Sequence, residues 1–268
     1  MKTIVLIAAM CGTVAVVADN CDVVNLCATN KCERMVVAHA GAKEAIGGDA
    51  NKTAAEDKCG VLLIGDSIRM GYCGSVREAM QDRADVFWPE GNCMFAHYTL
   101  RFLCEWRHIM PDPAKINVVH WNNGLWDILW DTGLHDGREP LTPCEDYVKT
   151  LIRIHRELRR YFPNARIVFA TTTPINTSIN CEPHTLGNAI VEEYNTAAVA
   201  ALKPLGVEID DLYSFVRDNS VPYVDMVHYT PEGSRMIAGE VVRVIDRQKK
   251  VAQEAIVDFP KGKSVLVK

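Results

Sequence analysis

From residue 61 onward, the chain alternates short apolar runs with longer segments in which apolar residues recur every three or four positions. The short runs are typical of strands buried on both faces, and the periodic segments are typical of amphipathic helices. Such an alternation predicts an α/β fold, a three-layer α/β/α sandwich in which helices cover both faces of a parallel sheet. Five strands are predicted, over Val61–Ile64, Val86–Trp88, Ile116–Trp121, Arg166–Thr171 and Val207–Asp211.

Three helices follow from the same pattern. The clearest lies between the third and fourth strands, where apolar residues from Val148 to Phe162 share one face and basic residues take the other. A second helix is predicted over residues 188–202, before Pro204 and Gly206. The third begins with Thr230 as N-cap and Pro231 in the first helical position, and it is expected to run to about Arg247.

Polar loops follow the predicted strands. The carboxyl ends of parallel strands meet at one edge of a sheet, and open α/β sheets bind their ligands there. This convergence of functional side chains indicates an enzyme. The loops are Gly65-Asp66-Ser67, Glu90-Gly91-Asn92, Asn122-Asn123-Gly124, Thr172-Thr173-Pro174 and the stretch from Asp225 to His228.

The first and last of these loops offer the parts of a nucleophilic site. A serine hydroxyl needs a base to remove its proton, and the base needs an acceptor that holds it in one tautomer. In Asp225-Met226-Val227-His228, one turn can bring the carboxylate to one imidazole nitrogen while the other nitrogen faces Ser67. We therefore predict Ser67, His228 and Asp225 as catalytic residues. The competing interpretation of Ser67 is an ordinary helix N-cap.

The motifs Gly65-Asp66-Ser67-Ile68 and Asp225-x-x-His228, with an asparagine loop between them, resemble the SGNH, or GDSL-type, hydrolase superfamily of esterases and lipases. The resemblance covers roughly residues 61–247. The string from Asn122 to Asp127, with the threonines before Pro174, is similar to a bacterial branch known mostly as predicted esterases. The resemblance implies a flavodoxin-like topology with five parallel strands, and the roles of nucleophile, base and orienting acid for Ser67, His228 and Asp225.

The resemblance also implies an oxyanion hole with three donors. They are the amide of Ser67, a glycine amide after the second strand and an asparagine side chain after the third. Gly91 is the candidate glycine, with Asn92 as an alternative. The superfamily usually has Gly-x-Asn-Asp in its third block, whereas this chain has Trp121-Asn122-Asn123-Gly124, so Asn122 is the expected donor and Asn123 the alternative. One such donor is worth on the order of 3 kcal/mol in the transition state.

Several other reactive or bulky side chains need an interpretation. Trp88 and Trp121 are expected to fill the core, whereas Trp126 and Trp130 follow the third strand and are candidate substrate contacts. Cys93 lies near the expected site but is not placed to be the nucleophile. Three histidines have no partner pattern and are predicted to be structural: His97, His120 and His155.

Composition limits the partners. With 268 residues, 48% of them hydrophobic, the chain can bury a full core. The net charge of −5, without a long basic run, argues against nucleic acid and against anionic membranes as partners. No stretch after the first residues is long enough to span a bilayer. We expect no cofactor and no metal, and a small-molecule or carbohydrate ester as the partner.

The N-terminal part gives less definite predictions. Residues 1–18 fit either a signal peptide or a strand of an extension, which would make the protein secreted or cytoplasmic, respectively. Residues 19–58 are predicted to be a linker or small extension, 59–248 the hydrolase domain and 249–268 a tail. Ten cysteines are many for a cytosolic enzyme, and one or two disulfides within the region from Cys21 to Cys59 would fit an oxidising compartment.

These observations are compatible with three functions. The first is a serine esterase that acts on short acyl esters, such as acetyl groups on carbohydrates, with lipase-type or thioesterase-type hydrolysis as its variant. The second is a binding module that keeps the fold without turnover. The third is a metal-dependent phosphodiesterase built from Asp66, Asn122 and His228, which is disfavoured because few acids and histidines stand at ligand spacing.

Overall fold

The computed structural model describes residues 58–128, 139–179 and 187–257, together with three short strands near the N-terminus. The chain divides into two compact units, Met1–Ala54 and Ala55–Lys268. In the first unit, three strands pair antiparallel in chain order: β1 (Ile7–Ala8), β2 (Thr13–Ala15) and β3 (Leu26–Cys27). The rest of residues 1–57, with the expected disulfides, lies outside the described residues.

The second unit is built on a five-stranded sheet in which every neighbouring pair is parallel. The order β5-β4-β6-β7-β8 confirms the flavodoxin-like topology, because the first strand in sequence lies between the second and the third. The predicted bounds hold for β6, whereas β4 and β5 begin earlier and β7 and β8 are shorter. The strands are β4 (Cys59–Ile64), β5 (Ala84–Phe87), β6 (Ile116–Trp121), β7 (Arg166–Ala170) and β8 (Glu208–Asp210).

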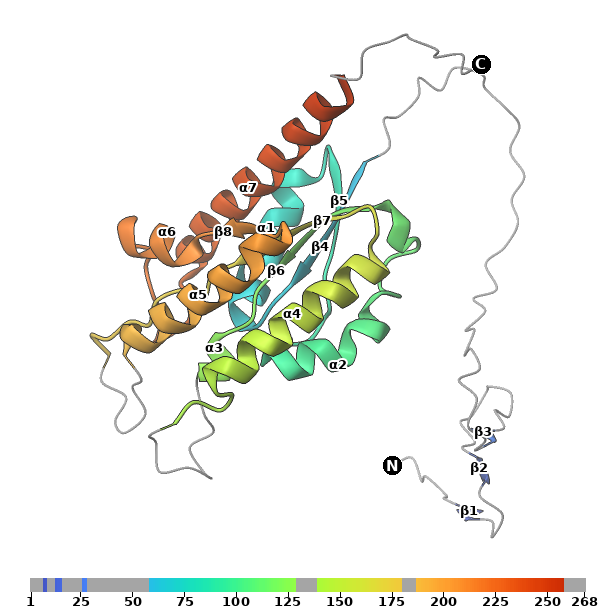
Figure 1. Ribbon diagram of the computed structural model, residues 1–268, viewed down its shortest axis with the longest axis horizontal. Coiled ribbons are helices and arrows are strands. Elements are labelled where there is room, and N and C mark those ends of the chain that lie inside the picture. Colours follow the sequence, from blue (N-terminus) through green and yellow to red (C-terminus); the bar gives the residue numbers. More distant parts are fainter. Residues whose placement is uncertain are drawn as a thin grey trace, which may run out of the picture. The chain divides into compact units, whose positions relative to one another are not determined.

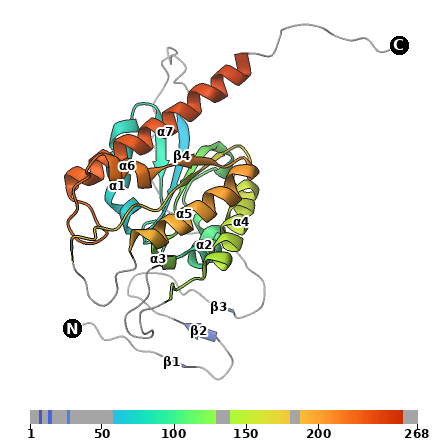
Figure 2. The same cartoon turned by 60° about the vertical axis from the view of Figure 1, so that its left-hand side comes forward.

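Helices cover both faces of this sheet and confirm the three-layer sandwich. One face carries α2 (Ala96–Trp106), α4 (Cys144–Tyr161) and α5 (Asn188–Leu202), which follow one another side by side (Figure 1). The other face carries α1 (Ser67–Met80), α6 (Leu212–Asp218) and α7 (Pro231–Val257), with α1 packed along α7 (Figure 2). The short helix α3 (Leu125–Ile128) follows β6, and single 3₁₀ turns occupy Pro113–Lys115 and Lys203–Leu205.

The predicted helices agree with α4, α5 and the start of α7. Thr230 caps α7, because its hydroxyl accepts the amide of Gly233 at 3.1 Å. The predicted end of this helix near Arg247 was wrong, since α7 continues to Val257. No glycine or proline interrupts residues 248–257, so nothing in that stretch stops the helix. Helices α1, α2 and α6 were not placed from the sequence.

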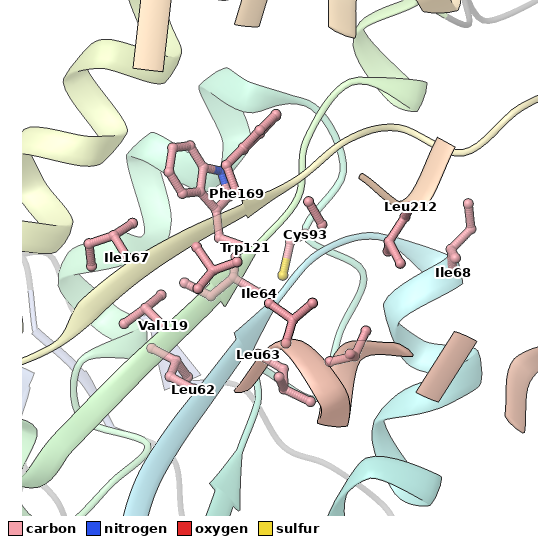
Figure 3. Close-up of a cluster of buried hydrophobic side chains, with 14 of the residues drawn as sticks. Leu62, Leu63, Ile64, Ile68, Cys93, Val119, Trp121, Ile167, Phe169 and Leu212 are labelled. Atoms are coloured by element: carbon pink, nitrogen blue, oxygen red, sulfur yellow. The ribbon is translucent and has the colours of Figure 1, made fainter. Parts of the chain in front are cut away.

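The core lies on both faces of the sheet. The side chains of Val61–Ile64 are fully buried, which explains the unbroken apolar run of β4. Figure 3 shows side chains of β4, β6 and β7 gathered in one cluster. Trp121 fills the core as predicted, with its ring centroid 4.9 Å from that of Phe169. Trp88 is half-buried against the core, and the guanidinium of Arg77 covers its ring at 3.6 Å.

Candidate active site

The turn between β4 and α1 presents Ser67 at the carboxyl edge of the sheet. Asp66 is the N-cap of α1, since its Oδ1 accepts the amide of Ile68 at 2.9 Å. The N-cap interpretation of Ser67 is therefore wrong: Ser67 is the first helical residue, half-buried, and its hydroxyl does not cap the helix. As a first-turn residue, it also has an amide without an acceptor inside the helix.

The structure brings Ser67 together with His228, 161 positions away, and His228 together with Asp225. The Nε2 atom of His228 lies 2.8 Å from Ser67 Oγ, and Nδ1 of the same ring lies 2.8 Å from Asp225 Oδ2. The second oxygen of Asp225 accepts the amides of Val227 at 2.9 Å and His228 at 2.7 Å. One carboxylate thus shapes the turn and orients the imidazole.

The charge of Asp225 defines the tautomer of this histidine. Burial acts to raise the pKa of the Asp225 carboxyl, but the amides of His228 and Val227 and the imidazole outweigh it, so the pKa is lowered. An ionised carboxylate only accepts hydrogen bonds, so the His228 Nδ1 must carry the proton. Its Nε2 then has a free lone pair toward the Ser67 hydroxyl, which is the arrangement of a general base.

The two asparagines after β6 have different surroundings. Asn122 is half-buried, its amide bonds to Ile64 O at 3.0 Å, and its Nδ2 donates one hydrogen bond, to Ala170 O at 2.8 Å. The second Nδ2 hydrogen is not used by any described group. Asn123 is fully buried, and its Nδ2 donates both hydrogens, to Met94 O at 3.0 Å and to Thr99 Oγ1 at 2.9 Å. Of the two, only Asn122 has a side-chain donor left for a ligand.

The loop between β5 and α2 holds the remaining oxyanion candidates. The carbonyl of Gly91 accepts Arg69 Nη2 at 2.6 Å, and the side chain of Asn92 accepts the amide of Met94 at 2.8 Å. The amide of Cys93 bonds to Gly65 O at 3.2 Å, which ties this loop to the nucleophile turn. The amides of Gly91 and Asn92 have no acceptor among the described residues, so both keep a donor to offer.

Two buried charged residues near the site had not been found from the sequence. Arg69 is 1% exposed, and its Nε and Nη2 each lie 3.3 Å from Gly65 O, in addition to the bond to Gly91. The sequence did contain a signal for this burial: Arg69 stands three positions before Tyr72 and seven before Val76, which places it on the buried face of α1. It links the nucleophile turn to the β5–α2 loop.

The second is Asp127, on the short helix α3. Phe95, the N-cap of α2, forms no side-chain cap bond, and the Asp127 carboxylate accepts the first amide of α2, on Ala96, at 3.0 and 3.1 Å. Burial raises the pKa of Asp127 to about 7, against the Ala96 amide, which lowers it. Burial also raises the pKa of Asp66 despite the Ile68 amide and the nearby guanidinium of Arg69. The carboxyl edge of the sheet therefore holds two acids whose ionised forms are disfavoured by burial.

Five other residues singled out in the sequence lie within the described ranges. Trp126 is 36% exposed on α3, and Trp130 lies outside the described residues. His120 is fully buried, with Nε2 2.8 Å from Asp210 Oδ2, and His97 Nε2 lies 3.2 Å from Thr150 Oγ1. His155 is half-buried. Cys93 is a buried thiol, and its side chain lies beside Ile64 in Figure 3.

Within the described ranges, no group of three or more histidine, cysteine, aspartate or glutamate side chains is arranged to hold a metal ion. Asp66, a ligand in the metal-dependent alternative, is buried and caps α1. No helix in these ranges combines the length and the apolar character needed to cross a membrane.

A family model described as "GDSL-like Lipase/Acylhydrolase family" matches residues 63–236, well over half of the chain. The chain belongs to this family. The resemblance to GDSL-type hydrolases is thereby confirmed. A relative from Arabidopsis thaliana, "GDSL esterase/lipase CPRD49", is 28% identical over 120 residues, which cover 41% of this chain and 47% of the relative. The chain thus aligns with about half of that relative's length.

Solved structures of proteins described as esterases share the fold. An acetyl xylan esterase, AlAXEase, is 16% identical with a TM-score of 0.55, covering 69% of this chain and 99% of that chain. A carbohydrate esterase family 3 protein from Talaromyces cellulolyticus is 17% identical with a TM-score of 0.53, covering 71% of this chain and 98% of that chain. At these identities the likeness confirms the α/β architecture and nothing finer.

Proposed function

We propose that this GDSL-type hydrolase is a serine esterase that removes short acyl groups, with acetyl esters of carbohydrates as its substrates. The observation that carries the proposal is the continuous chain from Ser67 Oγ through His228 to Asp225, with both contacts at 2.8 Å. A nucleophile, a base in the required tautomer and an ionised orienting acid are the parts that acyl transfer requires.

The proposed reaction has two steps. Ser67 Oγ attacks the ester carbonyl carbon while its proton passes to His228 Nε2, and Asp225 stabilises the imidazolium. The tetrahedral intermediate then expels the alcohol, which takes the proton from His228, and Ser67 keeps the acyl group. In the second step, His228 removes a proton from water and the hydroxide attacks the acyl-enzyme. The bond between Ser67 Oγ and the acyl carbon then breaks, the acid leaves, and His228 returns the proton to Ser67 Oγ.

The oxyanion that forms in both steps needs donors aimed at one point. We assign this role to the Ser67 amide and to the second Nδ2 hydrogen of Asn122, and a third donor to the amide of Gly91 or Asn92. The Ser67 amide stands at the positive end of α1, and the bond from Asn122 to Ala170 fixes the asparagine before substrate arrives. Donors that are fixed in advance need no reorganisation during the reaction.

The exposure of the acid and base supports a substrate whose bulk stays outside. The Asp225 side chain is 51% exposed and that of His228 is 43% exposed. Typical small-molecule sites, by contrast, enclose most of the ligand surface. An ester carried on a carbohydrate chain would reach this open edge with only its acyl group near Ser67. The two solved structures named above are described as an acetyl xylan esterase and a carbohydrate esterase, which supports a substrate of this kind.

A second candidate is hydrolysis of longer acyl chains, as in lipases and thioesterases. Met70, 44% exposed, stands one helical turn after Ser67. Val224, 65% exposed, has its amide bonded to His228 O at 2.9 Å. Exposed apolar side chains beside the nucleophile and the base would favour a longer acyl chain. Initial rates on p-nitrophenyl esters from acetate to octanoate separate the candidates, since the first requires the rate to fall as the chain lengthens.

The test of the serine mechanism compares two serine-to-alanine variants on the same helix. Ser67→Ala should lower the hydrolysis of p-nitrophenyl acetate by roughly a thousandfold or more, because it removes the nucleophile. Ser75→Ala, two turns further along α1, should keep wild-type rates and labelling by a fluorophosphonate probe. Unchanged hydrolysis in the Ser67 variant would refute the proposal. A wild-type protein that neither turns over esters nor takes the probe would favour the non-catalytic binding module.

A further inference from the structure

Asn123 joins the two loops that flank the nucleophile. Its Nδ2 reaches from the end of β6 to the β5–α2 loop, where it donates to Met94 O at 3.0 Å, and to the first turn of α2, where it donates to Thr99 Oγ1 at 2.9 Å. The Thr99 hydroxyl in turn donates to Cys93 O at 3.1 Å, so the bond reaches two consecutive residues of that loop. On its other side, Asn123 Oδ1 accepts the indole NH of Trp121 at 3.1 Å. Every polar atom of this side chain is bonded.

The backbone of Asn123 is held as firmly as its side chain. Its carbonyl accepts the hydroxyl of Tyr147 at 2.7 Å and that of Thr172 at 3.4 Å. The next residue, Gly124, has φ +147°, and a Cβ there would lie 2.1 Å from Thr172 Oγ1. Only glycine fits this position, and the chain direction after Asn123 is fixed by it. Asn123 is thus a rigid support and not an adaptable one.

The residue that Asn123 holds is itself under strain. Met94 has φ +48°, a left-handed conformation that residues with a side chain seldom adopt. Its amide is fixed by Asn92 Oδ1 at 2.8 Å and its carbonyl by Asn123. Such a conformation persists only where the surroundings impose it. Without the bond from Asn123, the loop that carries Gly91 and Asn92 can relax toward ordinary backbone angles.

We propose that Asn123 is a positioning residue of the oxyanion hole, which sets the distance between the Asn122 donor and the amides of the β5–α2 loop. The proposal rests on the serine esterase function proposed above. Asn123 follows Asn122 in the chain and is bonded to the loop that carries the amides of Gly91 and Asn92. Loss of this bond therefore displaces the Asn122 donor relative to the donors of the β5–α2 loop. The donors act on charge that develops in the transition state, so their displacement lowers kcat and leaves KM nearly unchanged.

Asn123→Asp is the direct test, because aspartate keeps the size and the acceptor for Trp121 and removes both donated hydrogen bonds. At pH 8 with p-nitrophenyl acetate, we expect kcat to fall about 100-fold, the loss typical of a displacement near 1 Å, with KM within about threefold. Thr99→Val removes one of the two acceptors without a change of shape and should lower kcat in the same direction by less. If Asn123→Asp does not fold, Thr99→Val tests the positioning role on its own, and an unchanged kcat in that variant would overturn it.

Asn195→Asp is the matched control. Asn195 is also buried and bonds to backbone, with Nδ2 and Oδ1 each 2.8 Å from Thr172 O and N, but it does not touch the β5–α2 loop. Its variant should lose thermal stability as much as Asn123→Asp and keep kcat. A folded Asn123→Asp protein with kcat within threefold of wild type would overturn the proposal, as would a loss confined to KM or an equal loss of kcat in the control.

The parallel measurement on Ser67→Ala separates the two proposals. If wild-type hydrolysis depends on Ser67 and the Asn123 variant keeps its kcat, only the positioning role fails. If wild-type hydrolysis does not depend on Ser67, the esterase function fails, and the positioning role fails with it.

Discussion

Replacing Asp127 by asparagine should make the protein more stable than wild type at alkaline pH. In the folded protein the pKa of Asp127 is about 7, against an ordinary value of 3.8, because burial disfavours the ionised form. A raised folded-state pKa contributes stability that is fully present below pH 3.8 and is lost as pH rises through 7. Asparagine does not titrate, and its Oδ1 can still accept the amide of Ala96.

The magnitude follows from the two pKa values. Between pH 5 and pH 8, ionisation of Asp127 should cost the wild type about 3 kcal/mol of unfolding free energy, to order of magnitude. The variant should therefore gain about this much relative to wild type over the same interval. Urea unfolding at pH 5, 6, 7 and 8 measures the difference directly. Other titrating groups are common to both proteins and largely cancel, although the electrostatic contact with Asp66 leaves a smaller residual difference.

A control separates this effect from ordinary helix capping. Asp112 accepts the amide of Ala114 at 2.9 Å in an exposed turn, so Asp112→Asn changes the same kind of bond in solvent. Its stability relative to wild type should stay within about 1 kcal/mol at every pH. The reasoning about Asp127 is refuted if Asp127→Asn stays parallel to wild type from pH 5 to 8, or loses stability relative to it as the pH rises.

Two further substitutions test the fold around the site. Gly74 lies exposed inside α1, and no atom lies within 4 Å of a Cβ added there. Gly74→Ala should therefore raise the unfolding free energy by about 0.5–1 kcal/mol, measured by urea unfolding. A decrease would contradict the described helix. Asp210→Ala leaves the fully buried His120 without its partner at 2.8 Å, so it should lower the unfolding free energy by about 3 kcal/mol or more in the same assay. A loss below 1 kcal/mol would contradict the described contact between His120 and Asp210.

The strands and the nucleophile turn could be predicted because their signals are local. Val61–Ile64 is fully buried, so its apolar run is unbroken and the following Gly65 marks its end. The helices differ in this respect. The regular face of α4 identified it, whereas α1 carries Arg69 on its buried face and two glycines in its interior, which obscured its periodicity. In α2, aromatic residues continue around to the less buried face, so no clear apolar stripe stands out.

The buried polar residues that hold the site could not be predicted from the sequence, because their bonding partners depend on the order of the strands in the sheet. Arg69 meets a carbonyl 22 positions away, and His120 meets an acid 90 positions away on a strand that is not its neighbour. The sequence offers Asn123 only as an alternative oxyanion donor to Asn122, because two adjacent asparagines have the same side chain and nothing local tells their roles apart. The partners Met94 and Thr99 distinguish them, and these contacts exist only once β5 and β6 lie on either side of β4.

The two halves of the site therefore depend on different interactions. Asp225 holds the base through three hydrogen bonds to residues within three positions of itself, in an exposed turn, so this half is encoded locally. The nucleophile half is held by Arg69, Asn123 and Asp127, which are all buried and which bond to residues between 22 and 31 positions away. Its geometry exists only when the sheet is complete, because each of these side chains would be an unpaired buried polar group otherwise. The precision of the oxyanion hole is thus tied to the stability of the whole domain, while the orientation of the base is tied to one carboxylate.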